Sequence, residues 1–321
     1  MSEPGSQRVE TVAAAETIRG IVDNLGRVVH APDETLRLCV LCLVGEGHLI
    51  LEDFPGVGKT MLAKALARSL DVSFSRMQFT PDLLPSDVTG VNVFNQRSNE
   101  FEFRPGPVFA NLLLVDEINR ASPKTQAALL ECMQEQQVTT DGVTNELDRP
   151  FMVMATQNPI EYEGTYPLPE AQLDRFTMRI AIGYPPLAEE AKMLTEQTAD
   201  PPLDALEPVA NAADAIALAD EAKAIFVEES LNRYVVALLR ATRGDSRLYL
   251  GASPRAGIAL LRVAKARALA DGRSFLEPDD VKAVAVPVLA HRLILAPEAR
   301  STGVSGAQIV QETLDKTPVP V

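Results

Sequence analysis

The segment from Leu51 to Thr60, with the sequence LEDFPGVGKT, constrains the fold of this chain more than any other feature. An apolar run, 48–51, leads into it, and an Ala- and Leu-rich run, 61–70, follows it. That order indicates a strand, a tight loop and a helix, which is the context that a phosphate-binding loop requires. Glycine lets backbone N–H groups approach an anion because it has no Cβ, and the amino end of a helix favours negative charge. The segment therefore predicts an α/β domain that binds a nucleotide.

The loop supplies the expected nucleotide contacts. The Lys59 ammonium can reach the β- and γ-phosphates, and the Thr60 hydroxyl can bind Mg²⁺. Asp53 departs from the usual pattern G-x-x-x-x-G-K-[ST], because it stands where the first glycine is expected. Aspartate tolerates turn and left-handed conformations, so we interpret the loop as intact. The nucleotide-binding residues expected here are Asp53, Phe54, Pro55, Gly56, Val57, Gly58, Lys59, Thr60 and Met61.

Charge and composition narrow the class of function. The 321-residue chain has a formal net charge of -14, whereas a general nucleic-acid-binding surface is normally basic. The sequence has no uninterrupted apolar span of about 20 residues, and the polar start, 1–10, lacks a signal-peptide core, so we expect no membrane span. Three cysteines, an odd number, fit a reducing compartment, and we expect a cytoplasmic protein.

Cys39 and Cys42 form a C-x-x-C pair, a spacing that also occurs in zinc and redox sites. They lie in the run 36–44, which is apolar on all sides, and Cys132 is isolated. Free cysteine commonly behaves as a small buried hydrophobe, so we interpret this run as a buried helix. The three histidines show no metal-ligand spacing, and we expect them to be packing or surface residues.

The first half of the chain alternates short apolar runs with helical segments. The candidate strands are 48–51, 72–77, 112–115, 151–155 and 178–182. Strands that alternate with helices imply a parallel sheet covered on both faces. Two insertions interrupt this order, and each is expected to form a hairpin; they span 89–107 and 137–149.

The pattern changes after Tyr184. The remaining sequence is Ala-, Leu- and Glu-rich with helical periodicity, and it predicts no further strand. Pro185 and Pro186 mark the expected linker. We therefore expect residues 1–185 to form the nucleotide-binding core and residues 186–321 to form an all-helical second domain, with a weakly patterned tail from Ser301.

Two acidic residues follow the apolar run 112–115. In a parallel sheet the carboxyl ends of the strands face the ligand, so Asp116 and Glu117 should lie beside the phosphate loop. Asp116 can hold Mg²⁺ through water, and Glu117 can orient and deprotonate an attacking water. A solvated acidic turn is the alternative, and the phosphate loop upstream favours the catalytic interpretation.

Asn158 and Arg175 flank the last two predicted strands. Asn158 could hydrogen-bond the γ-phosphate or the attacking water, although Asn-Pro also starts turns. Arg175 could pair with its neighbour Asp174, or it could act as an arginine finger in the ATP site of another subunit.

Arg255 lies in the first turn of a predicted helix. Ser253 is a favourable N-cap and Pro254 suits the first helical position. A cation at this place opposes the helix dipole, which suggests a partner anion. The γ-phosphate could be that anion, and a solvated arginine is the alternative.

With these elements in place, the chain resembles AAA+ ATPases, and specifically the MoxR family, over residues 10–300. Two segments are specific to MoxR-like proteins, QFTPDLLPSD at 78–87 and LPEAQLDRF at 168–176. The resemblance is also carried by the phosphate loop and by VDEINRA at 115–121, ATQNP at 155–159 and SPR at 253–255.

The resemblance implies a set of functional roles. Walker A would span Asp53–Thr60, Walker B would be Asp116 and Glu117, and the insertions would be the helix-2 insert and the pre-sensor-1 hairpin. Sensor 1, the arginine finger and sensor 2 would be Asn158, Arg175 and Arg255. In an assembled ring, Arg175 would serve the ATP of the next subunit, and the remaining residues would serve their own ATP.

The resemblance also implies ligands and partners. ATP and Mg²⁺ would be the ligands of a ring, usually a hexamer, that remodels a client protein. Clients in this family are often reached through a protein with a von Willebrand factor A domain, and outcomes include complex maturation and metal or cofactor insertion.

Two other functions stay open at this point. Related AAA+ motors that translocate along nucleic acid carry the same two hairpins, although the negative charge and the aromatic content of 5% argue against this function. A nucleotide-switched scaffold with little turnover is the third possibility, and the complete catalytic set weighs against it.

Overall fold

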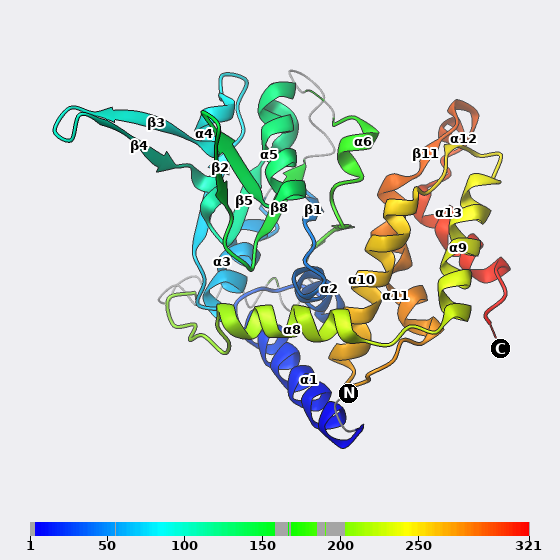
Figure 1. Ribbon diagram of the computed structural model, residues 1–321. Helices are drawn as coiled ribbons and strands as arrows, with labels where there is room; N and C mark the ends of the chain where they lie inside the picture. Colours follow the sequence, from blue (N-terminus) through cyan, green and yellow to red (C-terminus); the bar gives the residue numbers. More distant parts are fainter. Residues whose placement is uncertain are drawn as a thin grey trace.

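A five-stranded parallel sheet forms the centre of the first half of the chain (Figure 1). The computed structural model describes residues 4–54, 56–157, 166, 168–184, 190 and 203–320. Each predicted strand coincides with an observed one to within two residues at either end, so the predicted sheet is confirmed. In spatial order the strands are β2 (Phe74–Gln78), β5 (Leu112–Asp116), β8 (Met152–Gln157), β1 (Leu49–Glu52) and β9 (Met178–Ile180).

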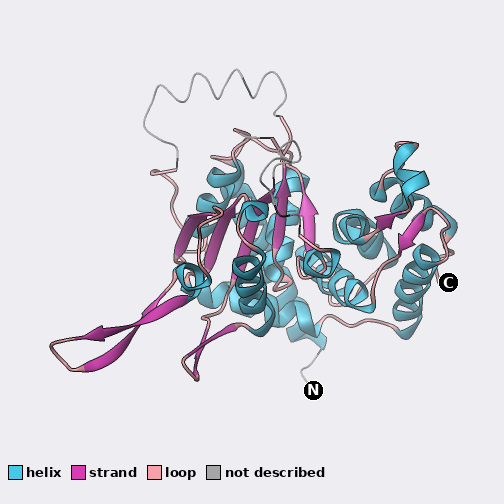
Figure 2. Cartoon of the chain, turned by 90° about the horizontal axis from the view of Figure 1, so that it is seen from above, coloured by secondary structure: helices cyan, strands magenta, loops and turns pink. Residues whose placement is uncertain are grey.

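Helices cover both faces of this sheet (Figure 2). Successive side chains of a strand point to opposite faces, and in the three inner strands β5, β8 and β1 both sets are mainly apolar because both faces are buried. Leu49 and Leu51 pack in the cluster with helices α1 (Pro4–Gly26), α2 (Asp33–Val44) and α3 (Lys59–Ser69). Ile50 packs in a second cluster with α4 (Pro85–Thr89) and α5 (Pro123–Glu135). The sheet therefore holds a rigid edge for the loops that follow its strands.

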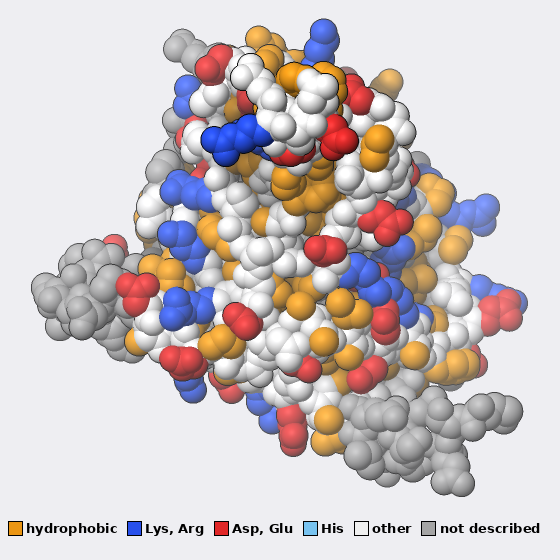
Figure 3. Space-filling view, turned by 60° about the vertical axis from the view of Figure 1, so that its left-hand side comes forward, with side chains coloured by type: hydrophobic (Ala, Val, Ile, Leu, Met, Phe, Trp, Pro, Cys, Tyr) orange, Lys and Arg blue, Asp and Glu red, His pale blue; other side chains and the backbone are white. Residues whose placement is uncertain are grey.

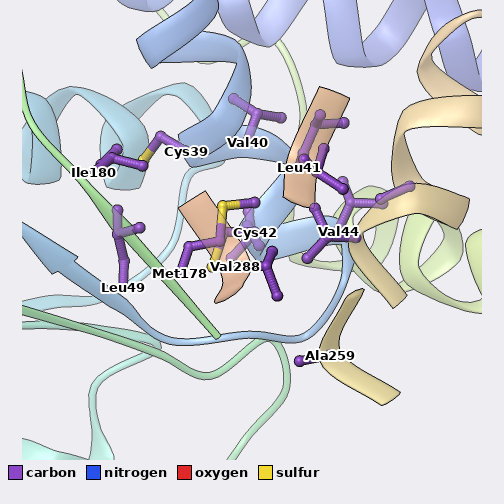
Figure 4. Packing of buried hydrophobic residues seen from close by; sticks show 14 of the residues in the cluster. Cys39, Val40, Leu41, Cys42, Val44, Leu49, Met178, Ile180, Ala259 and Val288 are labelled. Carbon is purple, nitrogen blue, oxygen red and sulfur yellow. The ribbon is translucent and has the colours of Figure 1, made fainter. Parts of the chain in front are cut away.

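Helix α2 lies in the middle of the larger cluster, and both of its cysteines are fully buried (Figure 4). Cys39 lies by Ile180 and Cys42 lies by Met178, both of strand β9. Burial raises the pKa of the Cys39 thiol to about 12, and it raises the pKa of Cys42 well above its usual value. These thiols are packing groups, as the apolar surroundings of the C-x-x-C pair predicted.

Two hairpins project from the core on the side of the sheet near β2 (Figures 1 and 2). The first joins β3 (Gly90–Asn95) and β4 (Glu100–Pro105), and the second joins β6 (Gln137–Thr140) and β7 (Val143–Glu146). The Asn92 amide donates a hydrogen bond of 2.6 Å to the Asp141 carboxylate, which links the two hairpins. Acidic and basic side chains are interspersed on the face that presents the first hairpin (Figure 3).

The second half of the chain packs as a mainly helical domain beside β9 and α2. Its helices are α8 (Ala212–Ala224), α9 (Glu229–Arg243), α10 (Pro254–Ala270), α11 (Pro278–Leu289), α12 (Pro297–Ser301) and α13 (Gly306–Lys316). A short α6 (Glu170–Leu173) precedes β9 in the core. The linker predicted at Pro185 and Pro186 lies outside the described residues. None of the described helices is both long and apolar enough to cross a membrane.

Two details of this domain correct the sequence analysis. An antiparallel pair of short strands, β10 (Leu248–Leu250) and β11 (Ile294–Leu295), stands where no strand was predicted. The weakly patterned tail from Ser301 also contains a helix that the sequence did not predict, α13, which buries Ile309, Val310 and Leu314 in the core. Strands this short carry too few residues to show a period of two. Three apolar positions on one helix face are likewise a weak signal in a short segment.

An arginine of the helical domain anchors it to the sheet. The buried Arg292 guanidinium binds the Asp174 carboxylate at 2.7 Å and the backbone carbonyl groups of Phe176 at 2.7 Å and Thr177 at 3.0 Å. Burial lowers the pKa of Arg292, and the Asp174 carboxylate opposes that shift. A buried charge of this kind requires its partner, so the two domains are held in one arrangement at this point.

Candidate active site

The phosphate loop joins the carboxyl end of β1 to the amino end of α3. Gly56 and Gly58 have φ of 87° and 93°, a region that residues with a Cβ rarely adopt. A Cβ at either position would meet nothing within 4 Å, so the space in front of these glycines is open. Gly58 begins α3 in a left-handed conformation, and Lys59 and Thr60 form its first turn. The loop therefore presents backbone N–H groups and a helix amino end to open space, which suits an anion.

Lys59 points along this loop. Its ammonium donates hydrogen bonds to the backbone carbonyl groups of Asp53 at 2.7 Å and Phe54 at 3.0 Å. Burial lowers the pKa of Lys59, and the nearby carboxylates of Asp53, Asp116 and Glu117 oppose the shift. The structure thus places the lysine within electrostatic reach of both acids at the end of β5.

Asp53 has a structural role at the entrance of the loop. Its buried carboxylate accepts hydrogen bonds from the backbone N–H groups of Ile182 at 2.6 Å and Gly183 at 2.7 Å, and from Phe54 at 3.0 Å. Its own φ is not positive, so this position does not need a glycine. The reason for the departure from the usual motif is therefore the anchoring of the segment after β9, and not the left-handed tolerance that the sequence suggested.

Asp116 ends β5 and is buried. One carboxylate oxygen accepts a hydrogen bond of 2.7 Å from the Arg76 guanidinium of β2, and the other accepts one of 3.3 Å from the Thr156 hydroxyl of β8. The two neighbouring strands therefore fix both oxygens at the edge of the sheet where the phosphate loop begins.

Glu117 follows in a strained conformation, with φ of 55° and ψ of 53°. Left-handed backbone is uncommon for a residue with a Cβ and deserves a physical cause. Its N–H donates a hydrogen bond of 2.9 Å to the Thr156 hydroxyl, and its carboxylate pairs with Arg120 at 2.9 Å. The bond to Thr156 therefore supports the left-handed turn that directly follows Asp116.

The remaining predicted site residues have fewer described contacts. Asn158 and Pro55 lie outside the described residues. Strand β8 ends at Gln157, one residue before Asn158 and beside β5. Phe54 is partly exposed and stacks on Tyr184 with ring centroids 5.6 Å apart. Val57 is buried, and Met61 packs against the larger cluster.

Arg175 and Arg255 lie together at the other end of the sheet. Both line a cavity of about 460 Å³ with His48 and Thr177, which directly precede β1 and β9. The Arg255 guanidinium is 3.5 Å from the Gln134 amide oxygen, at the end of α5. This is the edge where the strands begin, whereas the phosphate loop follows the edge where they end.

This placement corrects one expectation. Strand β1 alone separates His48 from the phosphate loop by its four residues, about 13 Å at the usual rise. Arg255 is therefore grouped with Arg175, and not with Lys59 and the acids of its own chain. The pairing of Arg175 with Asp174 that the sequence allowed is also absent among the described ion pairs, because Asp174 binds Arg292 and Ser253 instead.

Two residues that hold Asp116, Arg76 and Thr156, were not predicted from the sequence. Arg76 was hidden within a strand prediction, and its charge is a weak signal there because β2 is an edge strand whose side chains are partly buried or exposed. Thr156 stands in the motif ATQNP, two residues before Asn158, and its role depends on the lateral pairing of β8 with β5. No spacing rule along one chain reveals that pairing.

Comparisons with known proteins agree with this geometry. Residues 48–178 match the family described as ATPase family associated with various cellular activities (AAA), and residues 240–313 match the AAA lid domain. The chain is 49% identical over 300 residues to YeaC of Bacillus subtilis, covering 94% of each chain.

Two further relatives bear on the assignment. The chain is 39% identical to Chaperone MoxR1 of Mycobacterium tuberculosis, covering 96% of this chain and 84% of the relative. A crystal structure from Cytophaga hutchinsonii, of a protein assigned as an ATPase, superposes with a TM-score of 0.92 at 40% identity over 99% of both chains. The chain belongs to the MoxR family of AAA ATPases.

Proposed function

We propose that this protein hydrolyses ATP with the help of Mg²⁺ in a ring of identical subunits and uses the energy to remodel a partner protein. The observation that carries this proposal is the split arrangement of the catalytic candidates. Lys59, Thr60, Asp116 and Glu117 lie at one edge of the sheet, and Arg175 and Arg255 lie at the opposite edge. One subunit by itself therefore does not assemble the whole set around one nucleotide.

ATP fits the first edge. The open space in front of Gly56 and Gly58 admits a phosphate to the backbone N–H groups. The Lys59 ammonium now bonds to two loop carbonyl groups, and a phosphate oxygen would be a stronger, charge-assisted acceptor for it. The base would be held outside this loop, on residues that we do not assign.

Mg²⁺ also fits this edge. The oxygen donors available, the Thr60 hydroxyl and the Asp116 carboxylate, are too few to hold the ion without phosphate and water, which is its usual mode of binding. When bound, Mg²⁺ would neutralise charge on the β- and γ-phosphates. Arg76 already holds Asp116, so this guanidinium lies next to the place where the ion would bind.

Glu117 is the proposed general base. Its carboxylate is partly exposed, pairs with Arg120, and follows Asp116 at the edge that Lys59 faces. A carboxylate there can orient a water and take its proton as the water attacks the γ-phosphate. Asn158 is proposed to help hold that water or the γ-phosphate, and its neighbour Gln157 ends the strand beside Asp116.

Arg175 and Arg255 are proposed to complete the site of the next subunit. Both guanidinium groups line one cavity, in which the described acidic side chains are Glu46 and Asp174. Glu46 is already bound by Arg149 and Lys223, and Asp174 is bound by Arg292. The two arginines therefore keep positive charge available for an anion, and a neighbour's γ-phosphate is the anion that a ring would bring.

The remodelling role rests on the family. A relative at 39% identity carries the name Chaperone MoxR1, and the proposed chaperone activity comes from that likeness. A client, and a mediating protein with a von Willebrand factor A domain, are proposed on the same ground. A hexamer is the proposed ring.

The test is the rate of phosphate release from ATP by the purified full-length protein, with Mg²⁺ and with a chelator. Phosphate release should require Mg²⁺. The Glu117→Gln variant should release phosphate about 10²- to 10⁴-fold more slowly while it still binds ATP. Glu131→Gln, which changes an exposed acid on α5, is the matched control and should keep the rate. Binding of ATP without any release by the wild-type protein would instead favour a nucleotide-switched scaffold.

A further inference from the structure

One buried hydroxyl connects the two acids of the site. Thr156, at the end of β8, is 4% exposed. Its hydroxyl accepts the N–H of Glu117 at 2.9 Å and donates to the Asp116 carboxylate at 3.3 Å. Because a hydroxyl has one proton, accepting from a backbone N–H leaves that proton free for the carboxylate, and both bonds are satisfied at once.

The hydrogen bond from the Glu117 N–H to the Thr156 hydroxyl supports a residue with an unfavourable backbone conformation. Glu117 adopts φ of 55° and ψ of 53°, which a residue with a Cβ rarely adopts without support. Its carbonyl accepts the N–H of Arg120, which begins the short turn after β5. The Thr156 hydroxyl accepts the N–H of the same residue, Glu117, so both backbone polar groups of Glu117 are bonded and the turn is held in place.

The pairing of strands brings the hydroxyl to this point. Val115 of β5 lies opposite Ala155 of β8, so Asp116 and Thr156 are the next residues along the two neighbouring strands. Side chains at such lateral positions leave the sheet on the same side. Strand β8 ends at Gln157, so Thr156 lies two positions before the proposed sensor Asn158 in the sequence.

We propose that Thr156 is a positioning residue for hydrolysis, which rests on the proposed ATPase function. Its hydroxyl fixes the left-handed turn that aims the Glu117 carboxylate, and it orients the Asp116 carboxylate from the side opposite Arg76. A movement of β8 would thus shift both acids together. Thr156 touches neither ATP nor water in this proposal, and it acts through Asp116 and Glu117.

The test compares two variants at Thr156 with a matched control. Thr156→Val removes the hydroxyl and keeps the shape, and Thr156→Ser keeps the hydroxyl. Ser69→Ala removes another buried hydroxyl that accepts one bond, from Asn24, and donates one, to the Ala65 carbonyl. Ser69 ends α3, about 15 Å from Lys59 at the helical rise.

The proposal predicts a separation of rate from binding. Thr156→Val should lower kcat by about tenfold to a hundredfold, because a small misplacement of a catalytic group has an effect of this size. Its Kd for an unhydrolysed ATP analogue should stay near that of the wild type. Thr156→Ser should recover most of the rate, and Ser69→Ala should keep the wild-type kcat even where its Tm falls as much as that of Thr156→Val.

A second measurement does not depend on turnover. Hydrogen exchange of peptides that cover residues 112–121 should quicken at Glu117 in Thr156→Val and not in Ser69→Ala. The proposal is overturned if Thr156→Val keeps the wild-type kcat, if Ser69→Ala lowers kcat equally, or if Thr156→Ser gives no recovery. A wild-type protein that does not hydrolyse ATP would contradict the proposed function, while altered exchange at Glu117 would still verify the hydrogen bond.

Discussion

The buried Asp53 carboxylate accepts the backbone N–H of Ile182 at 2.6 Å, and so the entrance of the phosphate loop is tied to the segment that follows β9. A second bond, from Gly183 at 2.7 Å, uses the same oxygen. The strand that carries the phosphate loop and the strand that follows Arg175 are adjacent, and Asp53 fastens their carboxyl ends together.

The first prediction concerns Asp53→Gly, which restores the glycine of the usual motif. It should lower the free energy of unfolding by about 1–3 kcal/mol, because the backbone N–H groups of Phe54, Ile182 and Gly183 lose their acceptor. Urea unfolding measures this. Asp53→Asn keeps one side-chain oxygen and should lose less. A glycine variant as stable as the wild type would contradict the anchoring role.

The second prediction concerns Lys59→Ala. A charge-assisted hydrogen bond contributes about 1.5–3 kcal/mol, so its loss should weaken ATP binding by roughly 10- to 100-fold. Lys64→Ala is the control, because Lys64 lies exposed on the same helix, one turn further along. Titration of a fluorescent ATP analogue measures both. Equal affinities in the two variants would remove Lys59 from the site.

The third prediction concerns pH. His48 accepts the N–H of Val153 at Nδ1 and bonds the Met133 carbonyl through Nε2, which requires a neutral ring. Burial lowers the pKa of His48 to about 4, and it lowers the pKa of His291 well below the usual value.

Because the unfolded chain binds these protons at a higher pH, stability is complete above the unfolded pKa of about 6.5 and falls as the pH drops toward 4. The slope should be about 1.4 kcal/mol per pH unit for each histidine. Urea unfolding between about pH 7.5 and about pH 5 measures it, and His48→Gln should roughly halve it. A stability that does not change over this range would refute the buried neutral state.

The fourth prediction concerns Arg255→Ala. If the Arg255 guanidinium contacts the ATP of a neighbouring subunit, the variant should bind ATP at its own phosphate loop with wild-type affinity. It should hydrolyse that ATP slowly. Arg262→Ala changes another arginine of the same cavity, about two turns further along α10, and is the comparison for a general effect of charge. If Arg255→Ala weakens ATP binding and Arg262→Ala does not, Arg255 instead contacts the ATP bound by its own subunit.

The parts of the fold that follow from local sequence were predictable. The phosphate loop, the five short strands and the acidic end of β5 are each a run of consecutive residues, and the parallel sheet then places the strand ends on one edge. The C-x-x-C pair was also predictable, because an apolar run leaves no polar surroundings for a metal.

The remainder depended on contacts between distant residues. The motif at Arg255 predicts the start of a helix where a cation favours a partner anion. Only the packing of α10 shows which edge of the sheet Arg255 faces. Asp53 looked like a tolerated substitution until its bonds to Ile182 and Gly183 were placed. The strand pair β10 and β11 joins residues more than forty positions apart, and its segments are too short to show a pattern.

The most direct test of the account mixes two inactive variants. Glu117→Gln lacks the proposed base and Arg175→Ala lacks the proposed arginine finger, and each should hydrolyse ATP slowly by itself. In a mixed assembly, some interfaces combine an intact Glu117 from one subunit with an intact Arg175 from the next. About a quarter of the interfaces should be of this kind when subunits mix at random.

Phosphate release by the equimolar mixture should therefore rise well above the average of the two separate variants. A mixture of Glu117→Gln with Lys59→Ala is the control and should stay inactive, because both defects fall on the same side of the interface. If the first mixture shows only the average of its components, Arg175 does not act across subunits and the composite site is contradicted.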